Sequence, residues 1–228
     1  MKKDIAIKPE SPAPSETRSS LKLVVLGATG GTGLEIVRKA IEHDHSVTAF
    51  VRSPERLKSF HDRITVKQGD LLNSTELERV IQGHDAVVSG FGPRIPVSKA
   101  DANLLHQFAI ALTRAMLRAE VRRAVVESVA FLFKDAIFPP AYVLGKILFP
   151  GIVADSAAME DVFQQSGLDW TIVRPPQLTD RPYTGNYRER EGHLPRFGFK
   201  ISRADVADFM IKAAENPSLI RKIVGISN

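Results

Sequence analysis

The chain has no cysteine, a single tryptophan and no long apolar segment that is free of charge and proline. The absence of cysteine excludes disulfides, thiolate zinc sites, iron–sulfur clusters and a cysteine nucleophile, and it suits a reducing compartment. A membrane-spanning helix needs about 18 consecutive apolar residues, and the sequence contains no such run. We therefore expect a cytoplasmic protein without a membrane span.

Charge and composition indicate a globular chain of ordinary size. Of 228 residues, 43% are hydrophobic and 25% are charged, which is enough apolar material for a core. The net charge of +5 suits phosphorylated ligands, but with no accompanying motif we expect no nucleic-acid partner. The six histidines are scattered without metal-ligand spacing, so we also expect no metal site.

The composition divides the chain into two parts. Residues 1–20 hold three prolines among serine, glutamate and lysine, and they offer too little apolar area to offset chain entropy. We expect a disordered tail there and one folded domain over residues 21–228.

Within residues 21–228, short apolar segments alternate with amphipathic ones. Strands and helices that alternate at this spacing indicate βαβ units, and hence an α/β fold with a parallel, doubly wound sheet. The expected strands are 21–27, 46–52, 63–70, 85–92, 123–128, 169–175 and 222–227, and the expected helices are 34–43, 74–83, 98–119, 155–166 and 202–216.

A glycine-rich turn joins the first expected strand to the first helix. Residues 27–33 read GATGGTG, in the strand–turn–helix context that a dinucleotide fingerprint requires. The glycines allow the tight turn, the approach of a pyrophosphate and close helix packing, and the helix N-terminus offers free N–H groups to phosphates. The alternative is a packing turn with no ligand. The expected cofactor contacts here are Gly27, Thr29, Gly30, Gly31, Thr32 and Gly33.

The end of the second expected strand indicates which dinucleotide is bound. An NAD site has an acidic residue about 20 positions after the loop, where it bonds the ribose hydroxyls. Here the strand ends Val51-Arg52-Ser53, with no acid. Arg52, joined by Arg56, is suited to the 2′-phosphate of NADP(H). The alternative is that Arg52 is a solvated strand end.

Residues that follow the third and fourth expected strands extend this site. Asp70 closes the third strand, where it can bond adenine or, alternatively, form a turn. The small residues of the segment Ser89–Gly92 let a cofactor cross the sheet edge, and Arg94 can reach a phosphate from there. These segments add Ser53, Asp70, Gly90, Phe91, Gly92 and Arg94 to the expected cofactor set.

Several motifs together resemble the atypical short-chain dehydrogenase/reductases, an NmrA-like, NAD(P)H-binding superfamily. They are GATGGTG, FVRSPERL, QGDLLN, ESVAFLF and SGLDWTIVRPP, and the later RPPQLTDRPYTGNY and ISRADVADFMIKAA are similar to the flavin reductase/biliverdin-IXβ reductase group. The resemblance covers about residues 21–228. It implies a Rossmann domain that carries NADP(H) and passes hydride to a planar acceptor such as a flavin, quinone or tetrapyrrole. By position it adds Leu71 and Ser128 to the cofactor set, together with Pro175 and Gln177 at the Pro-Pro corner.

Two residues are candidates for proton transfer, Ser128 and Tyr142. Tyr142-x-x-x-Lys146 matches the proton-relay pair of the larger superfamily, and Ser128 lies 14 residues upstream. Prolines and a glycine interrupt that segment, however, whereas the pair normally lies on a helix. Ile152 and Ser156 occupy the positions at which the related pattern has tyrosine and lysine. We therefore expect that the dyad is absent.

Gln177 is a second departure from the group. The vertebrate flavin reductases have histidine directly after the Pro-Pro corner, and glutamine cannot donate a proton at neutral pH. Because solvent can protonate a reduced flavin, this departure weakens tetrapyrrole reduction more than flavin reduction.

The substrate side is expected in two segments, about 131–153 and 175–200. The first is apolar and follows the carboxyl end of a strand, where open α/β sheets bind ligands. It forms either a wall for a planar aromatic acceptor or a loop that packs on the core or a partner subunit. The substrate candidates are Phe131, Phe133, Tyr142 and Tyr187.

Two functions remain open from the sequence. One is an NADPH-dependent reductase of a small aromatic acceptor, as a monomer or homodimer. The other is a non-catalytic NADP(H)-binding sensor or regulatory protein, which the missing dyad would allow. A sugar-nucleotide epimerase-like enzyme fits less well, because the region after the sixth strand is short for its substrate domain.

Overall fold

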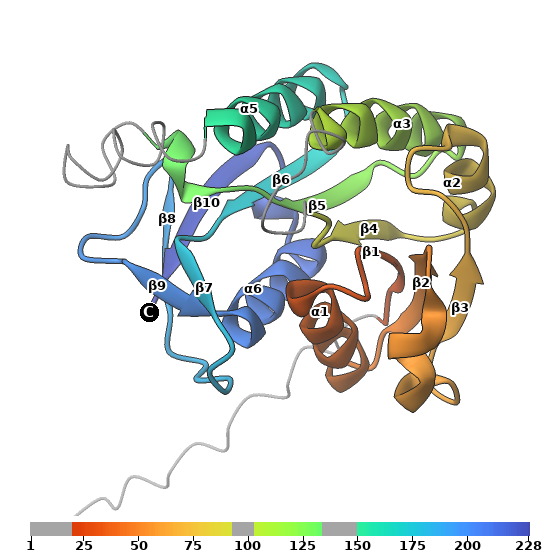
Figure 1. Ribbon diagram of the computed structural model, residues 1–228, viewed down its shortest axis with the longest axis horizontal. Helices are drawn as coiled ribbons and strands as arrows, with labels where there is room; N and C mark the ends of the chain where they lie inside the picture. Colours follow the sequence, from red (N-terminus) through yellow and green to blue (C-terminus); the bar gives the residue numbers. More distant parts are fainter. Residues whose placement is uncertain (1–19, 93–102, 134–149) are drawn as a thin grey trace, which may run out of the picture.

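The computed structural model describes residues 20–92, 103–133 and 150–228. An eight-stranded sheet in the order β3-β2-β1-β4-β5-β6-β10-β8 forms the middle layer (Figure 1). All neighbouring strands pair in parallel except β10 and β8, which pair antiparallel. The predicted α/β class and the predominantly parallel doubly wound sheet are therefore confirmed.

The seven parallel strands correspond to the seven predicted ones. They are β1 (Lys22–Leu26), β2 (Ser46–Val51), β3 (Thr65–Gln68), β4 (Ala86–Ser89), β5 (Arg123–Glu127), β6 (Asp169–Arg174) and β10 (Lys222–Ser227). In the described part of the chain, no helix has the length and the apolar character needed to cross a membrane.

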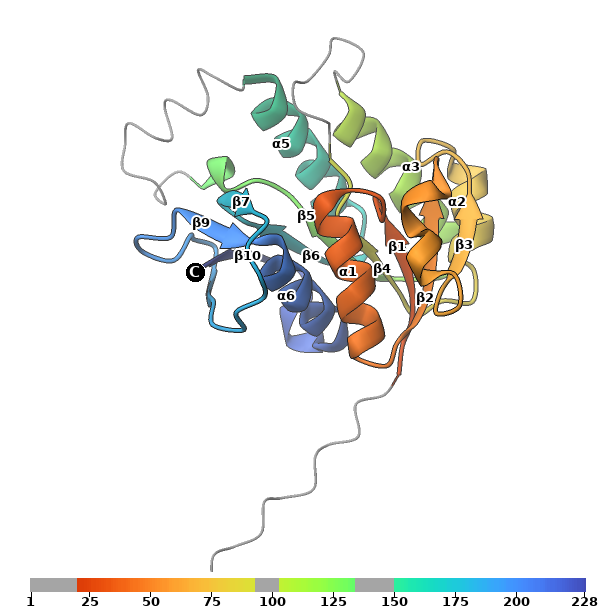
Figure 2. The same ribbon diagram turned by 60° about the horizontal axis from the view of Figure 1, so that its bottom comes forward.

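Helices cover both faces of the sheet, as Figures 1 and 2 show. On one face lie α1 (Gly31–Glu42) and α6 (Arg203–Glu215), packed against each other. On the other lie α2 (Ser74–Ile81), α3 (Leu104–Arg118) and α5 (Pro150–Gln165), with α3 between the other two. Helices α1, α2 and α6 begin and end within a few residues of the predicted bounds, whereas α5 begins at Pro150 instead of 155. Helix α3 begins at Leu104 instead of about 98, although residues 98–102 lie outside the described residues.

The core lies between the sheet and each helix layer. In β1, Leu23 and Val25 face the cluster under α1 and α6, whereas Val24 and Leu26 face the cluster under α2, α3 and α5. All four are fully buried. The apolar run of β1 is therefore explained by burial on both faces, which is usual for the central strand of a parallel sheet.

Residues 177–202 contain three strands that the sequence analysis did not predict. Strand β7 (Gln177–Thr179) pairs with β9 (Lys200–Ser202) in a separate two-stranded sheet, and β8 (Arg188–Glu191) pairs with β10 at the edge of the main sheet. All four residues of β8 are charged and exposed. The strand exists because it pairs with β10, so no apolar periodicity marks it in the sequence.

The N-cap of α2 is Asn73, directly before Ser74. The helix already includes Ser74, and the Asn73 side chain accepts from the N–H groups of Thr75 and Glu76. Asparagine and serine are both strong N-cap residues, so the adjacent pair made the boundary ambiguous by one residue.

Candidate cofactor site

The glycine loop lies between the carboxyl ends of β1 and β4. Gly27 has a φ of +71°, and a Cβ atom there would lie 2.7 Å from the backbone nitrogen of Phe91. A Cβ atom on Gly33 would overlap the carbonyl oxygen of Gly27. The Gly30 N–H also donates to that oxygen at 2.8 Å. Glycine is thus required at positions 27 and 33, because the loop folds back on itself and against the end of β4.

The N-terminus of α1 is open. Gly30 is its N-cap and offers no side chain, and the first turn contains no acidic residue. The Leu34 N–H is bonded to the Gly30 carbonyl at 3.0 Å, so the three preceding N–H groups have no carbonyl a turn earlier to accept them. Strand β1 lies where the sheet order reverses, between β2 and β4, which is the position at which such sheets bind ligands. This geometry suits an anion.

Two arginines follow the carboxyl end of β2, and one of them contacts the glycine loop. Arg56, in the 3-10 helix η1 (Pro54–Phe60), donates from Nη1 to the Thr29 carbonyl at 2.6 Å. Arg52 follows β2 directly and is exposed, with its carbonyl accepting from the Gln68 side chain at 3.1 Å. Because β2 is the neighbour of β1, the carboxyl end of β2 brings Arg52 to the same edge of the sheet as the glycine loop.

Other expected cofactor residues have roles in the loops around the site. The Asp70 carboxylate accepts from the Leu72 N–H at 3.0 Å, which is the turn-forming interaction that the sequence analysis left open. A Cβ atom on Gly90 would lie 3.1 Å from the Gly33 nitrogen, so Gly90 lets α1 approach β4. The Phe91 ring packs on Phe108 at 4.7 Å between centroids. Contacts of Asp70, Leu71 or Gly92 with a nucleotide stay predictions.

Glu127, the last residue of β5, belongs to the site although the sequence analysis did not single it out. Its carboxylate accepts a hydrogen bond from Thr32 Oγ1, in the first turn of α1, at 3.4 Å. Burial raises the pKa of Glu127 to about 7, while the Thr32 hydrogen bond and the charge of Arg203 act in the opposite direction. A carboxyl group that titrates near neutrality thus lies next to the open helix end.

The Glu127→Gln variant is expected to be more stable than the wild type in alkaline solution. Because the folded-state pKa of Glu127 is raised from 4.5 to about 7, the stability that its protonated form contributes is fully present only below pH 4.5 and is lost as the pH rises through 7. The gain in unfolding free energy should grow from near zero at pH 4 to at most about 3 kcal/mol at pH 8. Urea unfolding across this range measures it.

A matched control is Glu55→Gln, which neutralises an exposed carboxylate in η1. Its unfolding free energy should follow that of the wild type at every pH. A difference between Glu127→Gln and the wild type that is constant with pH would contradict the assignment of a raised pKa to Glu127.

Ser128 is held in a buried ionic cluster. Its hydroxyl donates to Glu160 Oε1 at 2.5 Å, and Arg174 binds both oxygens of the same carboxylate, at 2.9 and 2.5 Å. The Arg174 guanidinium also lies 4.5 Å from the Phe133 ring centroid. Ser128 would therefore have to give up its bond to Glu160 before it could donate a proton to a substrate. The Phe133 ring is covered by Arg174, and it is buried.

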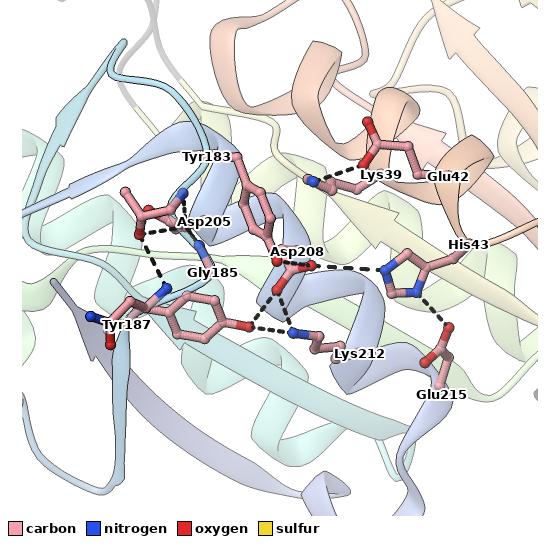
Figure 3. A network of polar contacts seen from close by, with 12 residues as sticks. Lys39, Glu42, His43, Tyr183, Gly185, Tyr187, Asp205, Asp208, Lys212 and Glu215 are labelled. Carbon is pink, nitrogen blue, oxygen red and sulfur yellow. Dashed lines mark hydrogen bonds and ion pairs between the residues drawn. The ribbon is translucent and has the colours of Figure 1, made fainter. Parts of the chain in front are cut away.

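The Thr-Gly-x-Tyr segment is hydrogen-bonded to side chains of α6. The N–H groups of Thr184 and Gly185 both donate to Asp205 Oδ1 at 2.9 Å, and the Tyr187 hydroxyl donates to Asp208 Oδ2 at 2.7 Å (Figure 3). Burial and Asp208 raise the pKa of Tyr187, so it holds its proton at neutral pH. The structure places Tyr187 in this network on α6 and does not bring it to the glycine loop. The expectation that Tyr187 lines the acceptor pocket stays a prediction.

The Pro-Pro corner lies next to Ser128 at the ends of β5 and β6. Pro175 is buried, and its carbonyl accepts from the Ala130 N–H at 3.1 Å. Gln177 is exposed at the start of β7. Phe131 is partly exposed in the 3-10 helix η3 (Ala130–Leu132). The predicted contacts of Pro175 and Gln177 with the cofactor and of Phe131 with the substrate stay predictions.

Part of the predicted site lies outside the described residues. This applies to the expected tail, to Arg94, and to Tyr142 and Lys146 with most of the segment 131–153.

Comparisons with known proteins identify the family of the chain. A family model described as NAD(P)H-binding matches residues 27–217. An uncharacterized chloroplast protein of Arabidopsis thaliana is 30% identical over 235 residues, covering 97% of this chain and 81% of that protein.

Solved structures share the fold at low identity. A short-chain dehydrogenase/reductase from Veillonella parvula in complex with NADP has a TM-score of 0.73 and 20% identity, covering 92% of this chain and 95% of that one. ChuY, an anaerobillin reductase from Escherichia coli O157:H7, has a TM-score of 0.75 and 20% identity, covering 90% and 96%. At these identities the likeness concerns the fold alone.

Proposed function

The chain belongs to the NAD(P)H-binding family, within the atypical short-chain dehydrogenase/reductases, and from this premise we propose that it is an NADPH-dependent reductase of a planar aromatic acceptor. The observation that carries the proposal is the closed glycine loop, with an open helix end and two arginines next to it. The open helix end and the two arginines at this edge of the sheet support a site for two phosphate groups of the cofactor.

Each part of the site has a role in this proposal. The N–H groups at the start of α1 bind the diphosphate, because they point out of the helix end. Arg52 and Arg56 bind the 2′-phosphate, for which charge-assisted bonds are strong. The ends of β5 and β6 hold the reactive half near Gln177, whose exposed amide can bond a carbonyl. When bound, NADPH supplies the hydride.

The surroundings of the hydroxyl groups favour an acceptor that takes its proton from water. The Ser128 hydroxyl is bonded to Glu160, and the Tyr187 hydroxyl to Asp208. A flavin or quinone accepts a hydride and then a proton from solvent, so no side-chain acid is required. A tetrapyrrole, as in the anaerobillin reductase, stays within the proposal as a third acceptor class.

The test is NADPH oxidation, followed by absorbance, with FMN, riboflavin, quinones and a bilin in turn. We expect turnover with at least one acceptor, and loss of turnover in the Gly33→Ala variant. Tight NADPH binding without turnover on any acceptor would contradict the reductase function and favour a non-catalytic NADP(H)-binding sensor. The hydrogen bond of the Ser128 hydroxyl to Glu160 is also compatible with that second function.

A further inference from the structure

Arg203 reaches the glycine loop from a different element of the fold. It is the first residue of α6, and a Cβ atom on Gly31 would lie 2.7 Å from its Cδ and Nε atoms. Since Gly31 is the first residue of α1, the Arg203 side chain lies across the open end of that helix. Gly31 and Arg203 lie too far apart along the chain to belong to one sequence motif.

The partner of Arg203 comes from the segment that follows β7. Arg203 Nη1 donates to Asp180 Oδ1 at 2.6 Å, and the Asp180 side chain is 89% exposed whereas that of Arg203 is 28% exposed. Ion pairs this exposed to water hold their partners weakly. Asp180 can therefore leave the guanidinium at small cost, without disturbing a buried contact.

The charges around Arg203 indicate what replaces Asp180. A guanidinium next to a helix N-terminus adds a full positive charge to the partial charge of the helix end. Glu127, which accepts a hydrogen bond from Thr32, is close enough for Arg203 to lower its pKa, but burial raises the pKa of Glu127 overall, to about 7. The positive end of α1 and Arg203 together suit an anion with two charges, which a dinucleotide diphosphate supplies.

We propose that Arg203 binds the diphosphate of the dinucleotide and gives up its ion pair with Asp180 when it does so. Without the dinucleotide, that ion pair holds the segment after β7 next to the cofactor site, and binding of the dinucleotide releases the segment. The inference rests on the proposed function and extends it. In this proposal Arg203 contacts the diphosphate, which NADPH and NADH share. Cofactor binding is thereby coupled to the segment that leads to Tyr183 and Tyr187.

The first test is Arg203→Gln in the full chain, with NADPH and NADH dissociation constants measured by nucleotide fluorescence. We expect both affinities to fall by about 10- to 30-fold, with their ratio unchanged, because a charge-assisted bond to the shared diphosphate is lost. Arg203→Lys should recover part of the loss. Arg181→Gln, which removes an exposed arginine one residue from Asp180, should bind like the wild type.

The second test is Asp180→Asn. Removal of the competing carboxylate should tighten binding of both nucleotides by about three- to tenfold, and equal thermal unfolding curves would show that the fold is intact. If Arg203→Gln binds both nucleotides with wild-type affinity, or loses affinity for NADPH alone, the role given to Arg203 at the diphosphate is wrong, while the proposed function still stands. A wild-type chain that binds neither nucleotide would overturn both.

Discussion

Gly33→Ala is expected to lower the affinity for NADPH and the affinity for NADH by about 1,000-fold each, or about 4 kcal/mol of binding free energy. The added methyl group would overlap the carbonyl oxygen of Gly27, which also accepts the Gly30 N–H. The loop cannot move away freely, because Gly27 itself is packed against the backbone of Phe91. The helix end and the loop would therefore separate, and the N–H groups of α1 would no longer converge on a diphosphate.

Gly151→Ala is the matched control, since a Cβ atom on Gly151 would have no neighbour within 4 Å. That variant should bind both nucleotides like the wild type, and calorimetry on the two variants gives the comparison. Far-ultraviolet circular dichroism should show the same helix content in both. A folded Gly33→Ala chain that binds NADPH normally would show that the loop is only a packing turn.

Arg52→Glu is expected to reverse the coenzyme preference, shifting the NADPH:NADH affinity ratio by about 1,000-fold toward NADH. Two effects add in this shift. The variant loses a guanidinium that binds the 2′-phosphate and places a like charge in its position, and the carboxylate can bond the free ribose hydroxyls of NADH. Arg52 is exposed and no buried contact depends on it, so the fold should be unaffected.

Arg63→Glu makes the same change in net charge at another exposed arginine, which lies in the turn before β3. It should leave the ratio of the two dissociation constants unchanged. If Arg52→Glu behaves like this control, Arg52 is a solvated strand end and Arg56 alone must account for any NADPH preference.

The fold and the glycine loop were predictable from the sequence because their causes are local. A strand buried on both faces needs an uninterrupted apolar run, as in β1, and neighbouring residues form that run. The glycines at 27 and 33 are required by contacts within the turn itself or with the strand next to it. Arg52 could likewise be found by its distance along the chain from the loop.

The remainder of the site depends on contacts between residues far apart in the chain. Glu127 meets Thr32 from a separation of 95 residues, and Arg203 meets Gly31 from still further away. Strand β8 is built of charged residues alone and is defined by its partner β10. The Tyr187 hydroxyl bonds Asp208 on α6, 21 residues further along the chain. No rule of residue spacing along the sequence predicts these contacts.

Isothermal titration of the wild-type chain with NADPH and with NADH tests the central claim most directly. We predict one NADPH per chain, bound at least about tenfold more tightly than NADH, because the shared diphosphate site is joined by a site for the 2′-phosphate. Absence of heat with both nucleotides would contradict the cofactor site, and NADH bound as tightly as NADPH would contradict the role given to the arginines.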